Sequence, residues 1–191
     1  MFYATHLTGF AVNVFQPVYA TWNSADNLSW TLSNGNLTAA NTSGSGQVAV
    51  RADTLLTRDT SMGMTVTTDP GSGRLVLGVC LTSVALSGAF SDAGAWGYAN
   101  SGNKNNAGSG TAYGATYTGG DFIECYWNAS ARSVGFKKNG SDQGVAFTGI
   151  TAGNITFIVQ KNSGVASTAS ITANFGATTP ANAFTYAGLY V

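Results

Sequence analysis

Short apolar runs separated by turn-forming residues fill this 191-residue chain, and this pattern constrains its fold more than any other feature. The runs are rich in Val, Ile, Thr, Phe and Tyr, and Gly, Asn, Asp or Ser bounds them. Helical periodicity is nearly absent, so the pattern predicts an all-β sandwich or barrel. Strands are expected near 9–15, 28–32, 36–40, 47–52, 62–67, 74–81, 112–117, 121–127, 132–137, 144–148, 155–160, 168–175 and 184–190.

The stretch VGFKKNGSDQGVAF, residues 134–147, has the pattern of a β-hairpin. Apolar residues alternate with smaller or polar ones on both sides of Asn139 and Gly140. Both of these residues tolerate the positive φ that a tight primed turn demands. We interpret the tip, which carries Lys137 and Lys138, as a solvated turn that reverses the chain.

Residues 83–111 form the longest stretch without a strand pattern, and they are rich in Gly, Asn and Ser. Long connections in compact domains are usually functional or disordered, and the aromatic residues of this one indicate a packed loop. We predict that it projects from one end of the sandwich and holds the partner contacts. For the Trp and Tyr of this loop a core position is favoured, and the Asn/Lys run is the better exposed candidate. The candidate binding residues are Trp96, Tyr98, Asn100, Asn103, Lys104, Asn105 and Asn106.

The charge of the chain limits its partners. Charged residues make up only 8% of the sequence, and 8 basic residues balance 8 acidic ones. A neutral chain has no long-range field with which to collect nucleic acid or an anionic membrane. We therefore expect neither nucleic acid nor a membrane as a partner.

Residue types that carry catalysis or bind metals are scarce. Glu124 is the single glutamate, and Asp121 lies three positions before it, so on a strand their side chains point to opposite faces. Such a pair does not converge on a sugar ring. His6 is the single histidine, and Cys80 and Cys125 are too few for a zinc site; we expect buried free thiols, with a disulfide as the alternative. The sequence predicts no catalytic residue, no metal and no cofactor.

Residues 1–20 are expected to form an N-terminal arm, separate from a sandwich domain of residues 21–191 that folds without it. The segment lacks the basic start of a secretory signal, and polar residues and Pro17 interrupt it, so it is not a membrane span. Exposed apolar side chains need a partner surface, and we expect this arm to dock on another subunit. The arm residues assigned to this contact are Phe2, Tyr3, Leu7, Phe10 and Phe15.

The order of several motifs resembles that of the SPRY domain. These motifs are the Leu-Gly-Val of RLVLGVCL, a WGY tripeptide, the Gly-Asp before FIECYW, GFKKNG with GVAF, and a late NFG. The segment TWNSADNLSWTLSNGNLTAAN resembles the opening strands of SPRY modules in bacteriophage and bacterial proteins, and the resemblance covers about residues 21–176. It implies a bent, jelly-roll-like sandwich of two antiparallel sheets and a binding module rather than an enzyme.

These observations lead to the expectation of a non-enzymatic phage virion protein that decorates a capsid or tail. Such a protein would be made in the host cytoplasm and would bind other virion proteins or copies of itself at the virion surface. The alternative is an adhesin that binds a host surface protein or glycan through the loop end. A carbohydrate-active enzyme is a third class, which the missing carboxylate pair disfavours.

Overall fold

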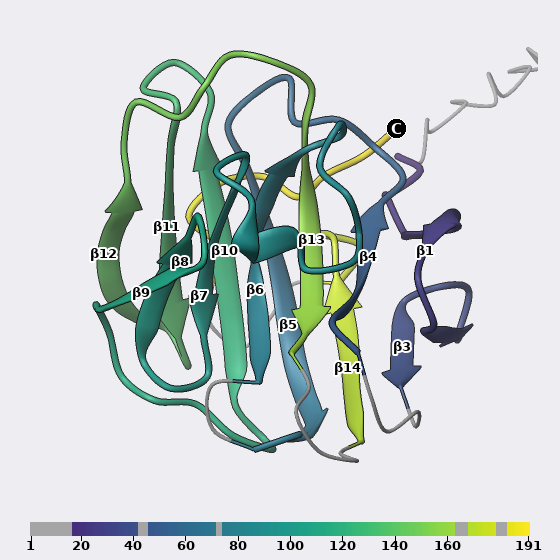
Figure 1. Cartoon of the computed structure of the whole chain (residues 1–191). Helices are drawn as coiled ribbons and strands as arrows, with labels where there is room; N and C mark the ends of the chain where they lie inside the picture. The colour runs from purple at the N-terminus through teal and green to yellow at the C-terminus, as the bar shows by residue number, and fades with distance from the viewer. Residues whose placement is uncertain (1–16, 42–45, 72–73, 163–167, 179–182) are drawn as a thin grey trace, which may run out of the picture.

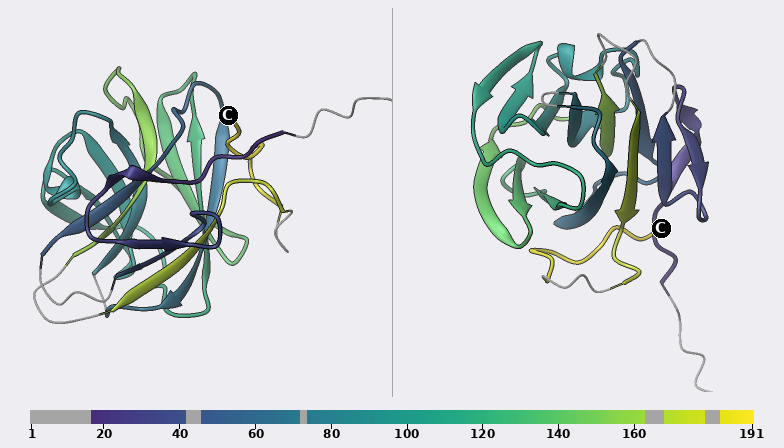
Figure 2. Two further views of the ribbon diagram at one scale, coloured as in Figure 1. Left: turned by 90° about the vertical axis from the view of Figure 1, so that its right-hand side faces the viewer. Right: turned by 90° about the horizontal axis from the view of Figure 1, so that it is seen from below.

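Two antiparallel sheets of seven strands each lie face to face as a sandwich (Figures 1 and 2). The computed structural model describes residues 17–41, 46–71, 74–162, 168–178 and 183–191. Within these ranges the only helical turn is η1, Ala89–Ser91. The prediction of an all-β, two-sheet antiparallel sandwich is therefore confirmed.

The first sheet has the strand order β1-β4-β13-β6-β7-β8-β9, so β1 and β9 are its edges. Its strands are β1 (Trp22–Asn27), β4 (Val48–Ala52), β6 (Leu75–Leu81), β7 (Ala95–Ala99), β8 (Asn103–Asn106), β9 (Ser109–Ala112) and β13 (Ile155–Lys161).

The second sheet has the order β12-β11-β10-β5-β14-β3-β2. Its strands are β2 (Thr31–Ser33), β3 (Thr38–Asn41), β5 (Thr60–Thr68), β10 (Phe122–Asn128), β11 (Ser133–Lys138), β12 (Ser141–Phe147) and β14 (Ala169–Asn174). β12 lies on the same side of the sandwich as β8 and β9 (Figure 1).

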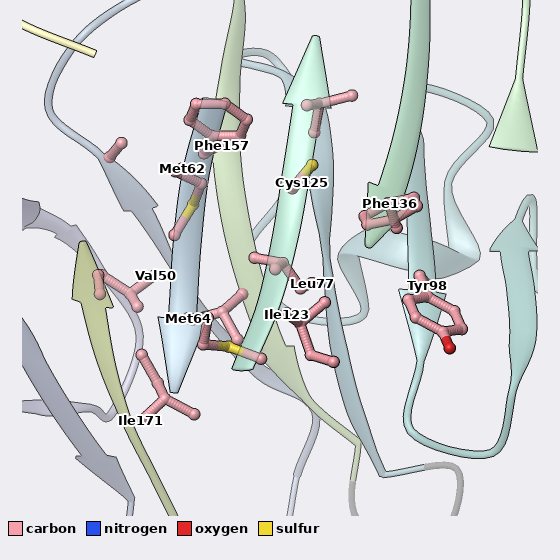
Figure 3. Packing of buried hydrophobic residues seen from close by; sticks show 14 of the residues in the cluster. Val50, Met62, Met64, Leu77, Tyr98, Ile123, Cys125, Phe136, Phe157 and Ile171 are labelled. Carbon is pink, nitrogen blue, oxygen red and sulfur yellow. The ribbon is translucent and has the colours of Figure 1, made fainter. Parts of the chain in front are cut away.

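Alternation along the strands decides which side chains fill the space between the sheets. In β6, Leu75, Leu77 and Val79 belong to the main core, whereas Val76 and Cys80 lie on the opposite face of the strand. The main core draws on both sheets, as Figure 3 shows for these labelled residues: Val50, Met62, Met64, Leu77, Tyr98, Ile123, Cys125, Phe136, Phe157 and Ile171.

The central strands of the first sheet are buried on both faces because residues 82–94 cover their outer side. Phe90 packs there with Val76, Cys80 and Ile158 in a second apolar cluster. A strand covered on both faces is apolar on both, which accounts for the continuous apolar run of β6.

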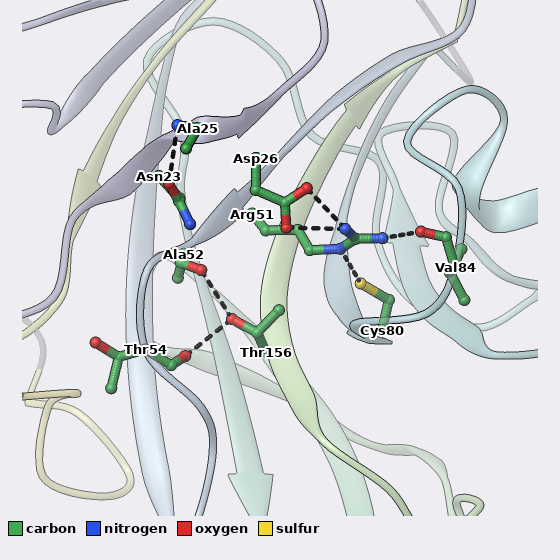
Figure 4. Close-up of polar contacts among 9 residues, drawn as sticks. All are labelled: Asn23, Ala25, Asp26, Arg51, Ala52, Thr54, Cys80, Val84 and Thr156. Carbon is green, nitrogen blue, oxygen red and sulfur yellow. Dashed lines mark hydrogen bonds and ion pairs between the residues drawn. The ribbon is translucent and has the colours of Figure 1, made fainter.

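Arg51 is the main polar group beneath this cover (Figure 4). Its guanidinium donates two 2.9 Å hydrogen bonds to the Asp26 carboxylate, one from Nε to Cys80 Sγ at 3.2 Å, and one to the Val84 carbonyl. Burial raises the pKa of the Cys80 thiol to about 11, although the nearby guanidinium opposes this shift. Cys80 and Cys125 are both buried and unpaired, as the sequence predicts.

The β11–β12 hairpin has the predicted two-residue turn. Asn139 and Gly140 both have positive φ, at 49° and 83°, and Lys138 pairs with Ser141 across the turn. Two of the predicted strands are wrong. Instead of a strand at 112–117, the structure has β9, which ends at Ala112. Residues 184–190 form only isolated bridges. The strand expected at 9–15 lies outside the described residues.

The segment 183–191 lies across the outer face of the second sheet. The Phe184 ring stacks on Phe122 with centroids 6.2 Å apart, and the Thr185 N–H donates to the Glu124 carboxylate at 2.6 Å. Each sheet of this sandwich therefore has a covering segment on its outer face.

Candidate functional site

The prediction that residues 83–111 form a projecting loop is wrong. The region contains η1 and the three strands β7, β8 and β9, which complete one side of the first sheet. What the sequence presents as a loop end is therefore a sheet edge, next to β12 of the second sheet (Figure 1).

Trp96 and Tyr98 lie on the core face of β7 and are 7% and 0% exposed. The Tyr98 ring packs against Tyr113, Tyr117 and Phe136 with centroids 5.1–5.3 Å apart, and its hydroxyl donates to a loop carbonyl. Burial raises the pKa of Tyr98 to about 12, so this phenol stays neutral at physiological pH. The core position favoured for both aromatic residues is what the structure shows.

Asn100 is also buried, and it closes a turn. Its Oδ1 accepts hydrogen bonds from the backbone N–H groups of Arg74 and Leu75, and its Nδ2 donates to Asp69 Oδ1 and the Gly71 carbonyl. All of its hydrogen-bonding capacity serves this turn, and the side chain does not face the surface.

Lys104 and Asn106 connect elements of the fold. The Lys104 ammonium donates to the Ala146 carbonyl of β12 at 2.8 Å and lies 5.2 Å from the centre of the Phe147 ring. It therefore joins the edge of the first sheet to that of the second. Asn106 Nδ2 donates to the carbonyls of two residues that precede and begin β7.

Asn103 and Asn105 are the predicted site residues that remain open to a ligand. Both are partly exposed on β8 and lie over Gly110 of β9, where an added Cβ would be 3.1 Å from Asn105 Oδ1 and 3.4 Å from Asn103 Nδ2. The absence of a side chain at Gly110 thus leaves room for both amides.

Asn105 also lines a small crevice of about 110 Å³ on the outer face of the first sheet. Gln47, Gln160 and Asn162 supply three further amides to its wall, and Phe90 contributes an aromatic edge. The buried Gln160 amide is already engaged, because its Oε1 accepts from the Phe90 backbone N–H at 3.2 Å and its Nε2 donates to Asn162. The partly exposed Asn105 and Gln47 can offer uncharged donors and acceptors to hydroxyl or peptide groups.

Sequence reasoning missed Gln47, Gln160 and Asn162 as crevice residues. Gln47 directly precedes β4, and Gln160 and Asn162 lie in and directly after β13. β6 and β7 separate these strands from β8 in the sheet, so the tertiary fold, not the local sequence, brings these residues to one crevice with Asn105. The one available signal is that Gln160 interrupts the apolar run ITFIV, which indicates a polar group that needs a buried partner.

The scarce carboxylates have structural partners. Glu124 is buried; it accepts a 2.8 Å hydrogen bond from Ser61 and lies 3.7 Å from the Lys137 ammonium. Asp121 accepts bonds from the Thr118 backbone N–H and from Asn139 and Lys138, and these donors outweigh its burial and lower its pKa.

The described residues contain no cluster of three or more His, Cys, Asp or Glu side chains that could hold a metal ion. Likewise, within the described ranges no helix has the length and apolar character needed to cross a membrane.

The assigned arm residues Phe2, Tyr3, Leu7, Phe10 and Phe15 lie outside the described residues, as does His6. Of the predicted arm, residues 17–20 are described, and they lie beside the segment 183–191. The Ala20 N–H donates to the Leu189 carbonyl at 2.9 Å, and the Tyr19 ring meets Tyr190 edge-on. The boundary after residue 20 stays a prediction, and these contacts favour one a few residues earlier.

A family model described as the SPRY domain matches residues 63–178, more than half of the chain. The chain belongs to the SPRY family. The match runs from within β5 to beyond β14, so it includes the crevice residues except Gln47. The resemblance inferred from the order of motifs is therefore confirmed.

Solved structures agree with this SPRY fold. The SPRY domain of human HERC1 superimposes with a TM-score of 0.69 at 20% identity, covering 80% of this chain and 96% of that one. The TRIM65 PSpry domain gives 0.63 at 10% identity, covering 82% and 92%. Identities this low demonstrate a shared fold alone.

A curated relative, the probable ATP-dependent RNA helicase ddx1 of Dictyostelium discoideum, is 36% identical over 75 residues. That alignment covers 37% of this SPRY chain and 10% of the helicase, so the chain matches about a tenth of the helicase's length.

SPRY domains mediate protein–protein interactions and are generally non-catalytic binding modules.

Proposed function

We propose that this SPRY domain is a non-enzymatic binding protein on the surface of a phage virion, where it decorates the capsid or tail. In this proposal it is made in the host cytoplasm and binds other virion proteins or copies of itself. Membership of a family of protein-binding modules supports the binding role. The carboxylates Asp121 and Glu124, which are both occupied by structural partners, give no support to a glycosidase.

The observation that carries the virion proposal is the segment TWNSADNLSWTLSNGNLTAAN, residues 21–41, which resembles the opening strands of SPRY modules in bacteriophage and bacterial proteins. Zero net charge is consistent with packing many copies on one particle, because neighbouring copies then do not repel one another.

The test is co-sedimentation of the purified full chain with phage particles assembled without it, and in parallel with host cells. Binding to particles and not to cells is the expected result. If the chain binds neither, or if it sediments with cells alone, decoration is wrong.

The amide-lined crevice favours a second candidate, an adhesin that binds a host surface protein or glycan. The partly exposed amides of Asn105 and Gln47 can exchange hydrogen bonds with sugar hydroxyls. A glycan array probed with the full chain tests this, with Asn105→Ala as the site variant. Asn23→Ala is the matched control, because Asn23 is a partly exposed asparagine of β1 near the opposite edge of the same sheet. Loss of a glycan signal in Asn105→Ala alone would support the adhesin.

A further inference from the structure

The two ends of the described chain lie side by side at one end of the sandwich (Figure 1), and exposed apolar residues occur there. Among the described residues, Val18 and Val191 are 69% and 79% exposed, and Leu55 and Tyr190 are also exposed. We call these four residues the terminal patch.

Direct contacts involve three of the four residues of the terminal patch. The Val191 N–H donates to the Val18 carbonyl at 2.8 Å, and the Arg58 guanidinium lies 3.8 Å from the centre of the Tyr190 ring. Leu55 belongs to the same β4–β5 connection as Arg58. Exposed apolar groups that are this closely connected indicate a covering partner.

A cavity of about 310 Å³ opens beside the patch and shares Leu55 with it. Three connections line it, through Leu55 and Leu56 between β4 and β5, Trp127 and Arg132 around the β10–β11 turn, and Asn154 before β13. A cavity of roughly 150 Å³ already accepts a benzene-sized ring, so this one has room for an aromatic side chain and some backbone.

The walls of this cavity suit an uncharged occupant. No carboxylate lines it, and the one cation, Arg132, already donates from Nε to the Ile150 carbonyl at 2.6 Å and to the Thr151 carbonyl. The Arg132 guanidinium also lies 5.6 Å from the centre of the Trp127 ring. Polar groups make up the larger part of the exposed wall, and Leu55, Leu56 and Trp127 supply apolar contacts, so the cavity suits an uncharged peptide with both aromatic and hydrogen-bonding groups.

Residues 1–16 of this chain have that chemistry. Their sequence, MFYATHLTGFAVNVFQ, contains no Asp, Glu, Lys or Arg and carries three Phe and one Tyr. They join the described chain at Pro17, next to Val18 of the patch. Sixteen residues in extended form reach roughly 50 Å, which is enough to meet a neighbouring molecule.

We propose that residues 1–16 of one copy dock on the terminal patch and into the adjacent cavity of a second copy. This rests on the proposed function, which makes the segment an assembly arm, and it adds the receiving surface and the identity of the partner. Because arm and receiving surface lie at the same end, two copies related by a twofold axis satisfy both contacts at once, as exchange of identical segments requires.

Sedimentation velocity of the full chain over a range of concentrations is the first test. We expect a dimer, at least 10-fold weaker association for Leu55→Asp (on the order of a binding hot spot), and no change for Val145→Asp. Val145 is the matched control, since it is an exposed apolar residue that lies on β12, away from the patch. A full chain that stays monomeric, or equal effects of the two variants, overturns the inference.

Photo-crosslinking identifies the receiving surface. A benzophenone amino acid replaces Phe10 in the full chain, and equal amounts of ¹⁴N- and ¹⁵N-labelled protein are mixed before irradiation. We expect cross-linked peptides of mixed isotope content that contain residues 55–57 or 127–132. Cross-links within one copy, or to other segments, overturn the proposal.

The two proposals fail in different ways. If the full chain is monomeric but still co-sediments with phage particles, docking between copies is wrong and decoration stands. If it neither dimerises nor binds particles, both are wrong.

Discussion

At the residue scale, Glu124 attaches the segment 183–191 to the second sheet, and its hydrogen bonds are open to test. The buried carboxylate accepts from Ser61 Oγ and from the Thr185 N–H, and Lys137 lies beside it. Glu124→Ala leaves these donors without an acceptor, and we expect the free energy of unfolding to fall by about 3 kcal/mol. Glu124→Gln keeps an acceptor oxygen and should cost only about 1 kcal/mol. Urea denaturation measures both, and equal losses would contradict the assignment to hydrogen bonds.

Asp121 makes a stabilising contribution that depends on pH. Its pKa is lowered in the folded protein, so the contribution is present above the unfolded-state pKa and disappears as pH falls through the folded value. At neutral pH we expect Asp121→Asn to cost about 0.5–1 kcal/mol, because the groups are partly exposed to solvent. Below about pH 4 the difference between variant and wild type should shrink. Urea titrations at both pH values measure this difference in unfolding free energy. A difference that does not depend on pH would contradict a lowered pKa of Asp121.

Asn100 and Asn105 show the limit of sequence reasoning at this scale. Both stand in one polar run and both are predicted as binding residues, yet Asn100 closes a buried turn and Asn105 lines an open crevice. The difference arises from residues far away in the sequence: Asp69 is a hydrogen-bond partner of Asn100, whereas Gln160 lines the same crevice as Asn105. No pattern within the run encodes those partners.

At the element scale, the β7–β9 edge depends on contacts to the other sheet, and Lys104 is the clearest of them. Lys104→Met keeps the aliphatic stem but removes the hydrogen bond to the Ala146 carbonyl and the contact with the Phe147 ring. We expect a loss of about 1 kcal/mol in unfolding free energy, measured by urea denaturation. An unchanged stability would mean that Lys104 is a free surface group, as the sequence suggests.

A comparison of the β11–β12 hairpin with β8 and β9 shows which strands can be predicted from the sequence. The β11–β12 hairpin is predictable because Asn139-Gly140 and the flanking alternation encode it locally. β8 and β9 read NKNN and SGTA, which carry no apolar alternation, since neither strand fills the main core with its side chains. Backbone pairing of β8 with β7, and of β9 with β8, forms these strands although their own sequences lack a strand pattern.

At the scale of the whole molecule, zero net charge predicts how association responds to salt. With 8 basic and 8 acidic residues, no long-range field steers partners to this chain. We expect the dissociation constant of any partner complex to change less than about 3-fold between roughly 50 and 500 mM salt. A steep salt dependence, measured by titration at several ionic strengths, would point to a locally charged interface instead.

The chain ends give the last prediction, which concerns where the sandwich begins. Residues 17–20 pair with the segment 183–191 through the Ala20–Leu189 and Val18–Val191 hydrogen bonds and the Tyr19–Tyr190 ring contact. Deleting residues 1–16 leaves these contacts in place, so at protein concentrations low enough to keep the full chain monomeric we expect an unchanged melting temperature.

Deleting residues 1–20 removes two hydrogen bonds and one aromatic pair, worth together about 2–3 kcal/mol. For a domain of this length that corresponds to a melting temperature lower by about 5–10 °C. Differential scanning calorimetry of both truncated chains decides the boundary. If the chain without residues 1–20 melts at the same temperature as the chain without residues 1–16, residues 17–20 belong to the arm and the sandwich begins at β1. If the shorter deletion already destabilises the chain, residues before Pro17 contribute to its own fold, and the exchange of arms between copies loses its basis.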